Sequence, residues 1–221
     1  MTPILYRENF YILDDGRVRQ FLITGTDKAL LLDTGFPDSH VWETVRSLTD
    51  GPVTILLTHG DQDHTGGLRK TDTCYLHPGD WPLVPAGPQL LPLHEGDVFT
   101  CGGYRLETIE IPGHSPGSVA FLDREKKLLL PGDSVQKSGP IYLFGGHRDL
   151  DAYIRSLQKL ETYQDMIEEI IPCHSEYPLN SASIQQVCLD AQALKNGQLP
   201  GEKHPVLPCS LYRGDWTQFL Y

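Results

Sequence analysis

Six consecutive residues, His59-Gly-Asp-Gln-Asp-His64, contain two imidazoles and two carboxylates, and a Gly-Gly pair follows two residues later. Imidazole nitrogens and carboxylate oxygens are common protein ligands for zinc and other transition metals. Alternate side chains of an extended loop point the same way, so His59, Asp61 and Asp63 can converge. The stretch therefore predicts a metal site, with His64 opening a short helix.

Three more residues of ligand type stand in short loops marked by Pro or Gly, each after an apolar run. They are His114 in IPGHSPGS, Asp133 in LPGDS and His174 in IPCHS. Side chains at strand ends are held by a rigid element while the loop supplies the local geometry. These positions suit further ligands of the same site.

In this order the motifs resemble the metallo-β-lactamase superfamily, whose pattern is His-x-His-x-Asp-His followed by a distant His, Asp and His. Leu32-Asp33-Thr34-Gly35 also resembles that family's early Asp-Thr-Gly signature. The resemblance covers essentially the whole chain and is to glyoxalase II-like and lactonase-like members. It implies an α/β fold, a four-layer αββα sandwich of two mixed β-sheets flanked by helices, with a two-metal site between the sheet ends.

The resemblance also implies a role for each residue of the motifs. The first metal set would be His59, Asp61 and His114, the second set Asp63, His64 and His174, and Asp133 would bridge the two. Asp33 would hold the motif loop without touching a metal. Asp63 would also act in catalysis by orienting the nucleophile.

Asp61 departs from the family pattern, which has histidine at this position. A carboxylate ligates zinc at about 2.0–2.2 Å, much as an imidazole nitrogen does, so ligation remains open. Asp61 is shorter, however, and its charge matters more. With Asp61 as a ligand, three carboxylates and a hydroxide balance two divalent ions, whereas histidine would leave a net positive charge. The acidity of bound water and the attraction for anionic substrates should both fall.

Three outcomes stay open for the metals. The site holds two divalent ions, with zinc the first expectation, or the oxygen-rich ligand set shifts the preference toward iron or manganese. Alternatively the first position is weak, and a single metal binds at the second. That single metal would use Asp63, His64, Asp133 and His174.

The leading functional expectation is a metallo-hydrolase that uses a metal-bound hydroxide to attack a small carbonyl ester, thioester or lactone. One alternative is an iron-dependent oxidoreductase of the same fold, similar to a dioxygenase, with iron on His59, His114 and Asp133. The other is a degenerate, non-catalytic binder of metal or ligand. Glutathione thioesters would call for a basic patch near the C-terminus, where Lys195, Lys203 and Arg213 are widely spaced.

Softer candidates lie in the segment GPIYLFGGH. Tyr142 could hydrogen-bond a substrate oxyanion and His147 could contact substrate, although a packed aromatic ring and a surface histidine are the plainer interpretations. His77 and Trp81 are interpreted as residues that could line a rim, and His40, His94 and His204 as ordinary surface or core residues.

The elements that position these residues are mostly strands. Short apolar or β-branched runs bounded by turn residues predict strands, and apolar residues on one face predict helices. The strands are expected at Phe10–Leu13, Val18–Thr24, Ala29–Leu32, Val53–Leu57, Thr73–Leu76, Val98–Thr100, Tyr104–Ile109, Val119–Leu122, Lys127–Leu130 and Glu169–Ile171. Helices are expected from an Asp38 or Ser39 cap to Leu48, at Leu150–Tyr163 and at Ser181–Leu194. The Pro-rich segment His77–Pro92 is expected to be a loop.

Composition limits the remaining possibilities. The 221 residues show no linker rich in Gly and Ser, so a single domain over residues 1–221 is expected. The formal net charge of −11 argues against nucleic acid as a partner and leaves a small-molecule substrate. No apolar run approaches a spanning helix and no signal peptide is recognised. With five scattered cysteines and no CxxC pair, a cytoplasmic protein with reduced thiols is expected, of unknown oligomeric state.

Overall fold

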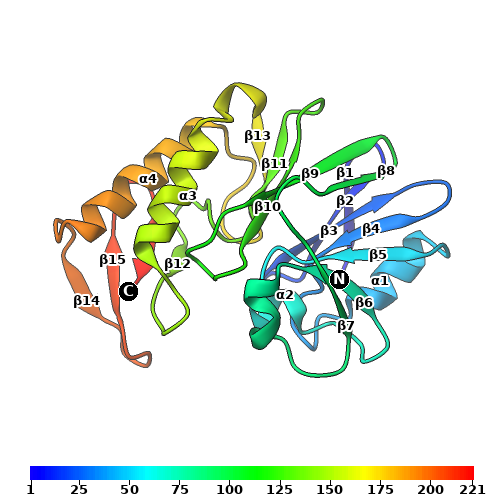
Figure 1. The fold of residues 1–221 in the computed structure, drawn as a ribbon, viewed down its shortest axis with the longest axis horizontal. Helices are drawn as coiled ribbons and strands as arrows, with labels where there is room; N and C mark the ends of the chain where they lie inside the picture. Colours follow the sequence, from blue (N-terminus) through cyan, green and yellow to red (C-terminus); the bar gives the residue numbers. More distant parts are fainter. The chain divides into compact units, whose positions relative to one another are not determined.

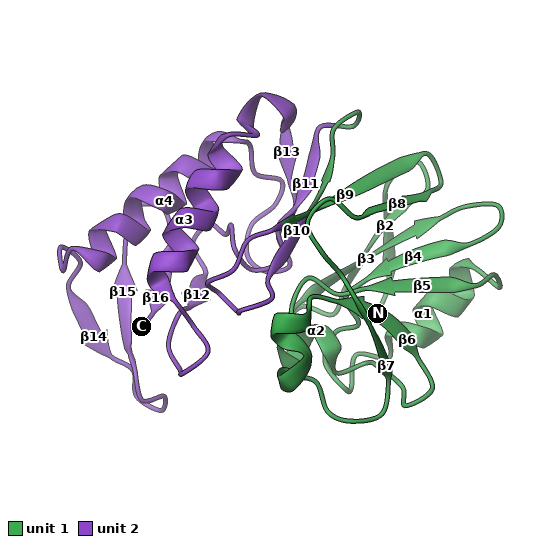
Figure 2. Ribbon diagram, in the orientation of Figure 1, with its two compact units in different colours: residues 1–109, 121–126 green, residues 110–120, 127–221 purple.

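The computed structural model describes residues 1–221 and divides into two compact units (Figures 1 and 2). Unit 1 comprises residues 1–109 and 121–126, and unit 2 comprises residues 110–120 and 127–221. Each unit is therefore built from two separate stretches of chain. The expectation of a single domain stays a prediction. No helix has both the length and the apolar character needed to cross a membrane.

Unit 1 contains a seven-stranded sheet whose strands follow one another in chain order. The strands are β1 (Pro3–Arg7), β2 (Phe10–Asp14), β3 (Arg19–Thr24), β4 (Ala29–Leu32), β5 (Val53–Leu56), β6 (Thr73–Leu76) and β7 (Gln89–Pro92). Strands β1 to β4 pair antiparallel, whereas β4 to β7 pair parallel. Because parallel strands end at the same edge, the segments that leave β4 and β5 emerge together.

Both faces of this sheet are covered within unit 1. On one face, helix α1 (Val41–Leu48) packs Val41 and Val45 against Leu22 and Leu31. On the other face, Phe10 lies 5.5 Å from the ring of Tyr104, which belongs to a hairpin of strands β8 (Val98–Cys101) and β9 (Tyr104–Glu110). Strands buried on both faces read as continuous apolar runs, and β4 is buried at all of its positions.

Helix α1 does not use the predicted cap. Its N-cap is His40, which adopts a left-handed conformation with φ of 55° and makes no side-chain cap hydrogen bond. Ser39 instead donates its hydroxyl to the carbonyl of Thr34, and Asp38 pairs with Arg17 at 2.8 Å. Both expected capping side chains are therefore committed to other partners.

The Pro-rich segment is more ordered than the sequence predicted. It contains the 3-10 helix η1 (Pro78–Leu83) and strand β7, so the expectation of a plain loop was wrong. Helix α2 (Gln62–Thr65) also begins two residues before the predicted start at His64. Strand β10 (Val119–Asp123) is divided by the boundary between the units.

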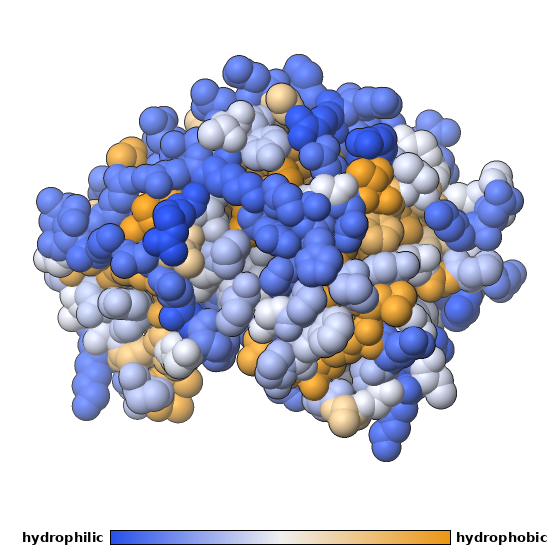
Figure 3. Space-filling view, in the orientation of Figure 1, coloured by the Kyte–Doolittle hydropathy of each residue, from blue (hydrophilic) through white to orange (hydrophobic).

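Unit 2 contains two long helices, α3 (Leu150–Glu161) and α4 (Ala182–Lys195). They pack on each other and run in opposite directions (Figure 1). Strand β11 (Leu128–Leu130) pairs parallel with β13 (Glu169–Ile170), and the 3-10 helix η2 (Gln164–Met166) connects α3 to β13. The surface of helices α3 and α4 that is visible in Figure 3 is mainly hydrophilic, with small hydrophobic patches.

A four-stranded sheet completes unit 2. Its order is β12-β16-β15-β14, from β12 (Pro140–Tyr142), β14 (Gly201–Lys203), β15 (Ser210–Arg213) and β16 (Gln218–Leu220). The ring of Phe219 in β16 contacts Tyr153 of α3, with centroids 6.5 Å apart, so the aromatic tail is docked on its own unit. None of the five cysteines forms a disulfide.

Candidate metal centre

A buried carboxylate, Asp33, organises the ligand loop of unit 1. It follows β4 with a φ of 60°, and its side chain is fully buried. Its Oδ1 accepts the amide proton of Thr58 at 2.8 Å, and its Oδ2 accepts the Thr58 hydroxyl at 2.8 Å. Nδ1 of His64 also lies 2.8 Å from Oδ2. Because a carboxylate offers only acceptors, His64 carries its proton on Nδ1 and presents the lone pair of Nε2 as a ligand.

The same hydrogen-bond argument fixes the tautomer of His59. Its Nδ1 lies 3.0 Å from the Thr58 hydroxyl, whose single proton is already donated to Asp33. The hydroxyl therefore accepts from His59, whose Nδ1 must carry a proton. The lone pair of His59 is thus on Nε2, as in His64. The two buried rings lie side by side, with centroids 4.0 Å apart.

Asp61 points its carboxylate toward His59. It is the N-cap residue of α2 and has an extended backbone, yet its side chain makes no capping hydrogen bond. Its backbone carbonyl accepts the first hydrogen bonds of the helix, from the amides of His64 and Thr65. Oδ2 of Asp61 lies 3.5 Å from Nε2 of His59. The side chain of an Asp at the N-cap ordinarily caps the helix. The Asp61 carboxylate instead faces the imidazole of His59, as a ligand of the same metal would.

Asp63 forms a second pair with His64. Its Oδ2 lies 3.6 Å from Nε2 of His64, and its side chain is 24% exposed. Unit 1 therefore presents two imidazole–carboxylate pairs, one at each end of the motif. The sequence predicted that His59, Asp61 and Asp63 would converge from one extended loop. Asp63 instead lies in helix α2, and its carboxylate faces His64.

In unit 2, Asp133 lies between two histidines. Its Oδ2 is 3.7 Å from Nε2 of His114 and 3.3 Å from Nε2 of His174. Nδ1 of His114 lies 3.0 Å from the carbonyl of Tyr142, which can only accept a hydrogen bond. The proton of His114 is therefore on Nδ1 and its lone pair on Nε2. One oxygen of Asp133 thus lies at 3.3–3.7 Å from an imidazole nitrogen of each histidine.

The loops that carry Asp133 and His174 are tied together within unit 2. The buried Gln136 donates Nε2 to the carbonyl of Asp133 at 3.0 Å, and its Oε1 accepts the Ser175 hydroxyl at 3.3 Å. The amide of Cys173 donates to the carbonyl of Gly132 at 3.1 Å. These contacts hold the two ligand side chains at a set spacing.

The His114 loop is packed tightly against α3. Gly113 has a φ of 134°, and a Cβ at this position would overlap the backbone of Tyr153. The amide of Asp149, the N-cap of α3, donates to the carbonyl of Gly113 at 2.9 Å. Nη1 of Arg148 donates to the carbonyl of His114. The glycine is therefore needed where the helix start meets the ligand loop.

The donor set fits transition-metal ions. Two ligand atoms placed 2.0–2.2 Å from a tetrahedral ion are about 3.4 Å apart. The four imidazole–carboxylate separations within the units run from 3.3 to 3.7 Å. Distances beyond about 3.2 Å are long for hydrogen bonds between these groups. The spacing and the outward Nε2 lone pairs therefore suit metal ions held by nitrogen and oxygen.

The softer candidates occupy different surroundings. Tyr142 is 40% exposed and packs its ring on Phe144, so what it contributes to His114 is a backbone carbonyl. His147 is exposed and lines a hollow of about 650 Å³ in unit 2, together with Arg148, Lys195 and Tyr221. The side chains of Tyr142 and His147 take no part in the hydrogen bonds described above for the predicted ligands.

Three supporting residues were missed by the sequence interpretation: Thr58, Asp80 and Gln136. Each acts through hydrogen bonds to backbone or to a neighbouring side chain. Thr58 directly precedes the motif, so its place could have been noticed. Asp80 and Gln136 carry no motif, and only the folded chain reveals their partners.

Paired imidazole nitrogens and carboxylate oxygens, on loops at the ends of parallel strands, define a class of metal-binding α/β proteins. Within that class the chain belongs to the metallo-beta-lactamase superfamily, because residues 13–174 match the family model of that description. All seven predicted ligands and Asp33 lie inside the matched region. The predicted family is confirmed.

Two curated relatives illustrate the similarity. The chain is 31% identical over 173 residues to the hydroxyacylglutathione hydrolase of Bdellovibrio bacteriovorus, covering 75% of this chain and 65% of that protein. It is 26% identical over 212 residues to the acyl-coenzyme A thioesterase MBLAC2 of Gallus gallus, covering 76% of each. The chain thus spans slightly less than two thirds of the first relative's length.

Solved structures show the same fold. The metallo-beta-lactamase from Pontibacter korlensis matches with a TM-score of 0.72 at 18% identity, covering 86% of this chain and 98% of that one. TTHA1623, solved in a di-iron-bound form, matches with a TM-score of 0.63 at 25% identity, covering 85% and 98%. The predicted fold class, an α/β sandwich of mixed sheets with flanking helices, is confirmed.

Proposed function

We propose that the chain is a metal-dependent hydrolase that cleaves thioesters. The observation that carries the proposal is the orientation of three histidines, His59, His64 and His114. Each holds its proton on Nδ1 through a partner in its own unit, so each offers Nε2 to a metal. The thioesterase and hydroxyacylglutathione hydrolase named above support the reaction class.

In this proposal two divalent metal ions are held by seven side chains. The first set is His59, Asp61 and His114, the second is Asp63, His64 and His174, and Asp133 belongs to both. Support comes from the imidazole–carboxylate pairs inside each unit and from the order of the motifs within the family match. When bound, such metals lower the pKa of water and polarise the substrate carbonyl.

The remaining chemistry belongs to the protein. Asp63 is partly exposed and faces His64, so its carboxylate can orient the attacking water and accept its proton. A thiol has a pKa of about 8.5, so a thiolate leaves without help from a general acid. A site built from carboxylates and from imidazoles that use Nε2 as a metal ligand offers no general acid. It therefore suits thioesters better than esters or amides with poorer leaving groups.

The acyl carrier is proposed to be other than glutathione. Recognition of glutathione's carboxylates would favour unpaired basic side chains near the C-terminus. Instead Lys195 lies 2.6 Å from Asp151, and Arg213 lies 2.6 Å from Glu202. These exposed pairs partly offset the charge of two of the three basic residues, and Lys203 is the third. The hollow beside Lys195 and His147 has a volume of about 650 Å³, within the range of small-molecule pockets.

Zinc is the first metal to test, although Asp61 favours a second candidate function. The carboxylate makes the ligand set richer in oxygen, which shifts preference toward iron or manganese. TTHA1623, 25% identical to this chain, was solved with two iron ions. An iron-dependent oxidoreductase is therefore the alternative to the hydrolase. Near-stoichiometric iron in protein that releases no thiol from any thioester would favour it.

The test is thiol release by protein reconstituted separately with zinc, iron or manganese. Metal content is measured by mass spectrometry, and each form is offered acyl-coenzyme A thioesters, S-lactoylglutathione and oxygen esters with the same acyl groups. We expect cleavage of the coenzyme A thioesters to exceed that of the matched oxygen esters. A fully loaded protein that cleaves no thioester would refute the proposal.

A matched pair of variants separates the metal centre from general effects. His114→Asn removes a proposed ligand, whereas His40→Asn changes an exposed histidine whose left-handed backbone asparagine also tolerates. We expect thiol release to be abolished by the first change and retained after the second. Equal activity of the two variants would show that His114 does not serve the reaction.

The proposed partner is a small-molecule substrate alone, in the cytoplasm. The net charge of −11 supports the absence of a nucleic-acid partner, and five cysteines without a disulfide support a reducing compartment. Binding of labelled RNA or DNA at physiological salt would contradict the first of these points.

A further inference from the structure

The ligand loop of unit 1 is held from a second side by η1. We propose that Asp80, in η1, is a positioning residue that sets where Asp61 lies and thereby the affinity of the first metal set. The inference rests on the proposed function in taking His59 and Asp61 as ligands of the first of two metal ions.

The contact that carries the inference joins Asp80 to Gly60, the residue between those two ligands. Oδ2 of Asp80 accepts the amide proton of Gly60 at 2.7 Å. Asp80 has no exposed surface and Gly60 is also buried. A buried amide bonded to a carboxylate is a strong, charge-assisted hydrogen bond, and removing the acceptor would leave that amide unsatisfied.

Close packing reinforces this hydrogen bond. A Cβ on Gly60 would lie 2.9 Å from Cβ of Leu83 and 3.0 Å from the carbonyl oxygen of Asp80. The backbone of η1 therefore lies directly against the loop, at a distance that only glycine permits. Gly60 cannot move toward η1, and its bond to Asp80 keeps it from moving away.

The segment that carries Asp80 is itself well anchored. Nδ1 of His77 accepts the amide of Gly79 at 3.1 Å, and Nε1 of Trp81 donates to the carbonyl of Leu76 in β6 at 2.9 Å. Two prolines further restrict its backbone. The position of Asp80 is thus fixed relative to the sheet, and it transmits that position to Gly60.

Asp33 and Asp80 together clamp the loop on either side of His59. Asp33 holds Thr58, one residue before His59, and Asp80 holds Gly60, one residue after it. Asp61 follows immediately and has a shorter reach than the histidine of the family pattern. Its carboxylate can meet a metal only if the backbone before it stays in place, so this position depends on the Asp80 anchor.

The test compares Asp80→Ala with Asp80→Asn in the full-length protein. Asparagine can still accept the Gly60 amide through Oδ1, whereas alanine cannot. Zinc affinity is measured by competition with a chromophoric chelator, and cobalt(II) absorption reports the ligand geometry. We expect alanine to weaken one of two metal equivalents about 10- to 100-fold, as loss of outer supporting contacts does. The zinc affinity of Asp80→Asn should stay within about threefold of the wild-type value, and its cobalt spectrum should match that of wild type.

Asp123→Ala serves as the matched control. Asp123 is also a buried carboxylate of unit 1 that accepts backbone amides, those of Arg105, Glu125 and Lys126, and it lies in a different turn. This variant should lose stability while keeping both metal affinities. A general loss of stability would therefore be distinguished from a specific loss of metal.

A second measurement covers the case in which Asp80→Ala does not fold. In wild-type protein the Gly60 amide should exchange slowly with solvent, and in Asp80→Asn its resonance should shift while the exchange stays slow. Wild-type metal affinity in a folded Asp80→Ala protein, or rapid exchange of the Gly60 amide in wild type, would overturn the inference. If wild-type protein binds metal but cleaves no thioester, that result would count against the proposed function and not against the role of Asp80.

Discussion

The carboxylate of Asp33 accepts a 2.8 Å hydrogen bond from Nδ1 of His64, and both side chains are fully buried. The same carboxylate accepts two protons from Thr58. One acid therefore fixes the tautomers of two neighbouring histidines, His64 directly and His59 through the Thr58 hydroxyl. The tautomers of two proposed metal ligands are therefore set by Asp33, which is not itself a proposed ligand.

Asp33→Asn should consequently weaken metal binding without removing any ligand. Asparagine has one acceptor oxygen, so at least one of the three donors would face an NH₂ group. We expect metal affinity to fall about 10- to 100-fold and the free energy of unfolding to fall by about 1–3 kcal/mol. Chelator competition and denaturant titration of the metal-free protein measure the two effects separately. Unchanged affinity would show that the Asp33 contact does not set the tautomers.

Replacement of Asp61 by histidine tests the departure from the family pattern. The Asp61 side chain makes no capping bond, so the change should leave the stability of the metal-free protein nearly unaltered. Histidine restores a net positive charge to the loaded site. Zinc occupancy of the first position and hydrolysis of a generic ester or lactone should both rise. If metal content and turnover both match wild type, Asp61 is not a ligand.

Gly113 offers a test of how the His114 loop is positioned. A Cβ there overlaps the Tyr153 backbone, and the φ of 134° is unfavourable for any other residue. We expect Gly113→Ala to lower the free energy of unfolding by about 2–4 kcal/mol, from overpacking and backbone strain together. Gly146→Ala is the control, since nothing lies within 4 Å of a Cβ at that position. Equal thermal midpoints for the two variants would contradict this view of the loop.

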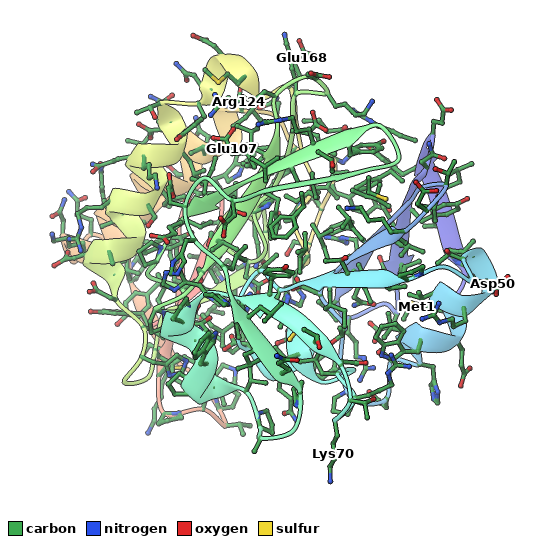
Figure 4. The ribbon with its side chains drawn as sticks, turned by 45° about the vertical axis from the view of Figure 1, so that its right-hand side comes forward. Met1, Asp50, Lys70, Glu107, Arg124 and Glu168 are labelled. Atoms are coloured by element: carbon green, nitrogen blue, oxygen red, sulfur yellow. The ribbon has the colours of Figure 1, made fainter.

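Glu107 and Arg124 predict a pH dependence of stability. Nε and Nη2 of Arg124 donate to the two carboxylate oxygens of Glu107, each at 2.7 Å, and both residues are labelled in Figure 4. The Arg124 hydrogen bonds hold the pKa of Glu107 below its ordinary value of 4.5. The pair therefore contributes stability above that value, and the contribution is lost as pH falls through the lower folded-state pKa.

Denaturant titrations of wild type and Glu107→Gln at several pH values measure this contribution. Because Arg124 is partly exposed, the difference at neutral pH should not exceed about 1 kcal/mol, and it should shrink toward zero in acid. A difference that grows as pH falls would have the wrong sign for this pair. The pH series thus checks the cause as well as the size.

Residues whose types carry the signal were predictable from sequence. The apolar run Ala29–Leu32 predicted a strand and forms β4 with the same bounds. The ligand motifs predicted the family because imidazoles and carboxylates stand at recurring places in the chain. Assignment of the seven ligands to two metals stays a prediction.

Other features depend on contacts that leave no pattern in the sequence. Asp80 lies in PGDW, and its partner is a backbone amide twenty residues earlier, which any residue except proline would supply. The cap of α1 moved to His40 because Ser39 and Asp38 found partners elsewhere. The strands of the C-terminal sheet are short, of three or four residues each, so periodicity has little length in which to appear.

The interleaving of the two units has a consequence for synthesis of the chain. Residues 110–120, which carry His114, belong to unit 2 but leave the ribosome before residues 121–126, which complete unit 1. Domains generally fold as units from the N-terminus during translation. Here neither unit is one uninterrupted segment of chain, so no single cut yields two fragments that each correspond to one unit. A gene split after residue 109 would leave unit 1 without residues 121–126, which include Phe121–Asp123 of β10. A split after residue 126 would leave His114 on the wrong fragment.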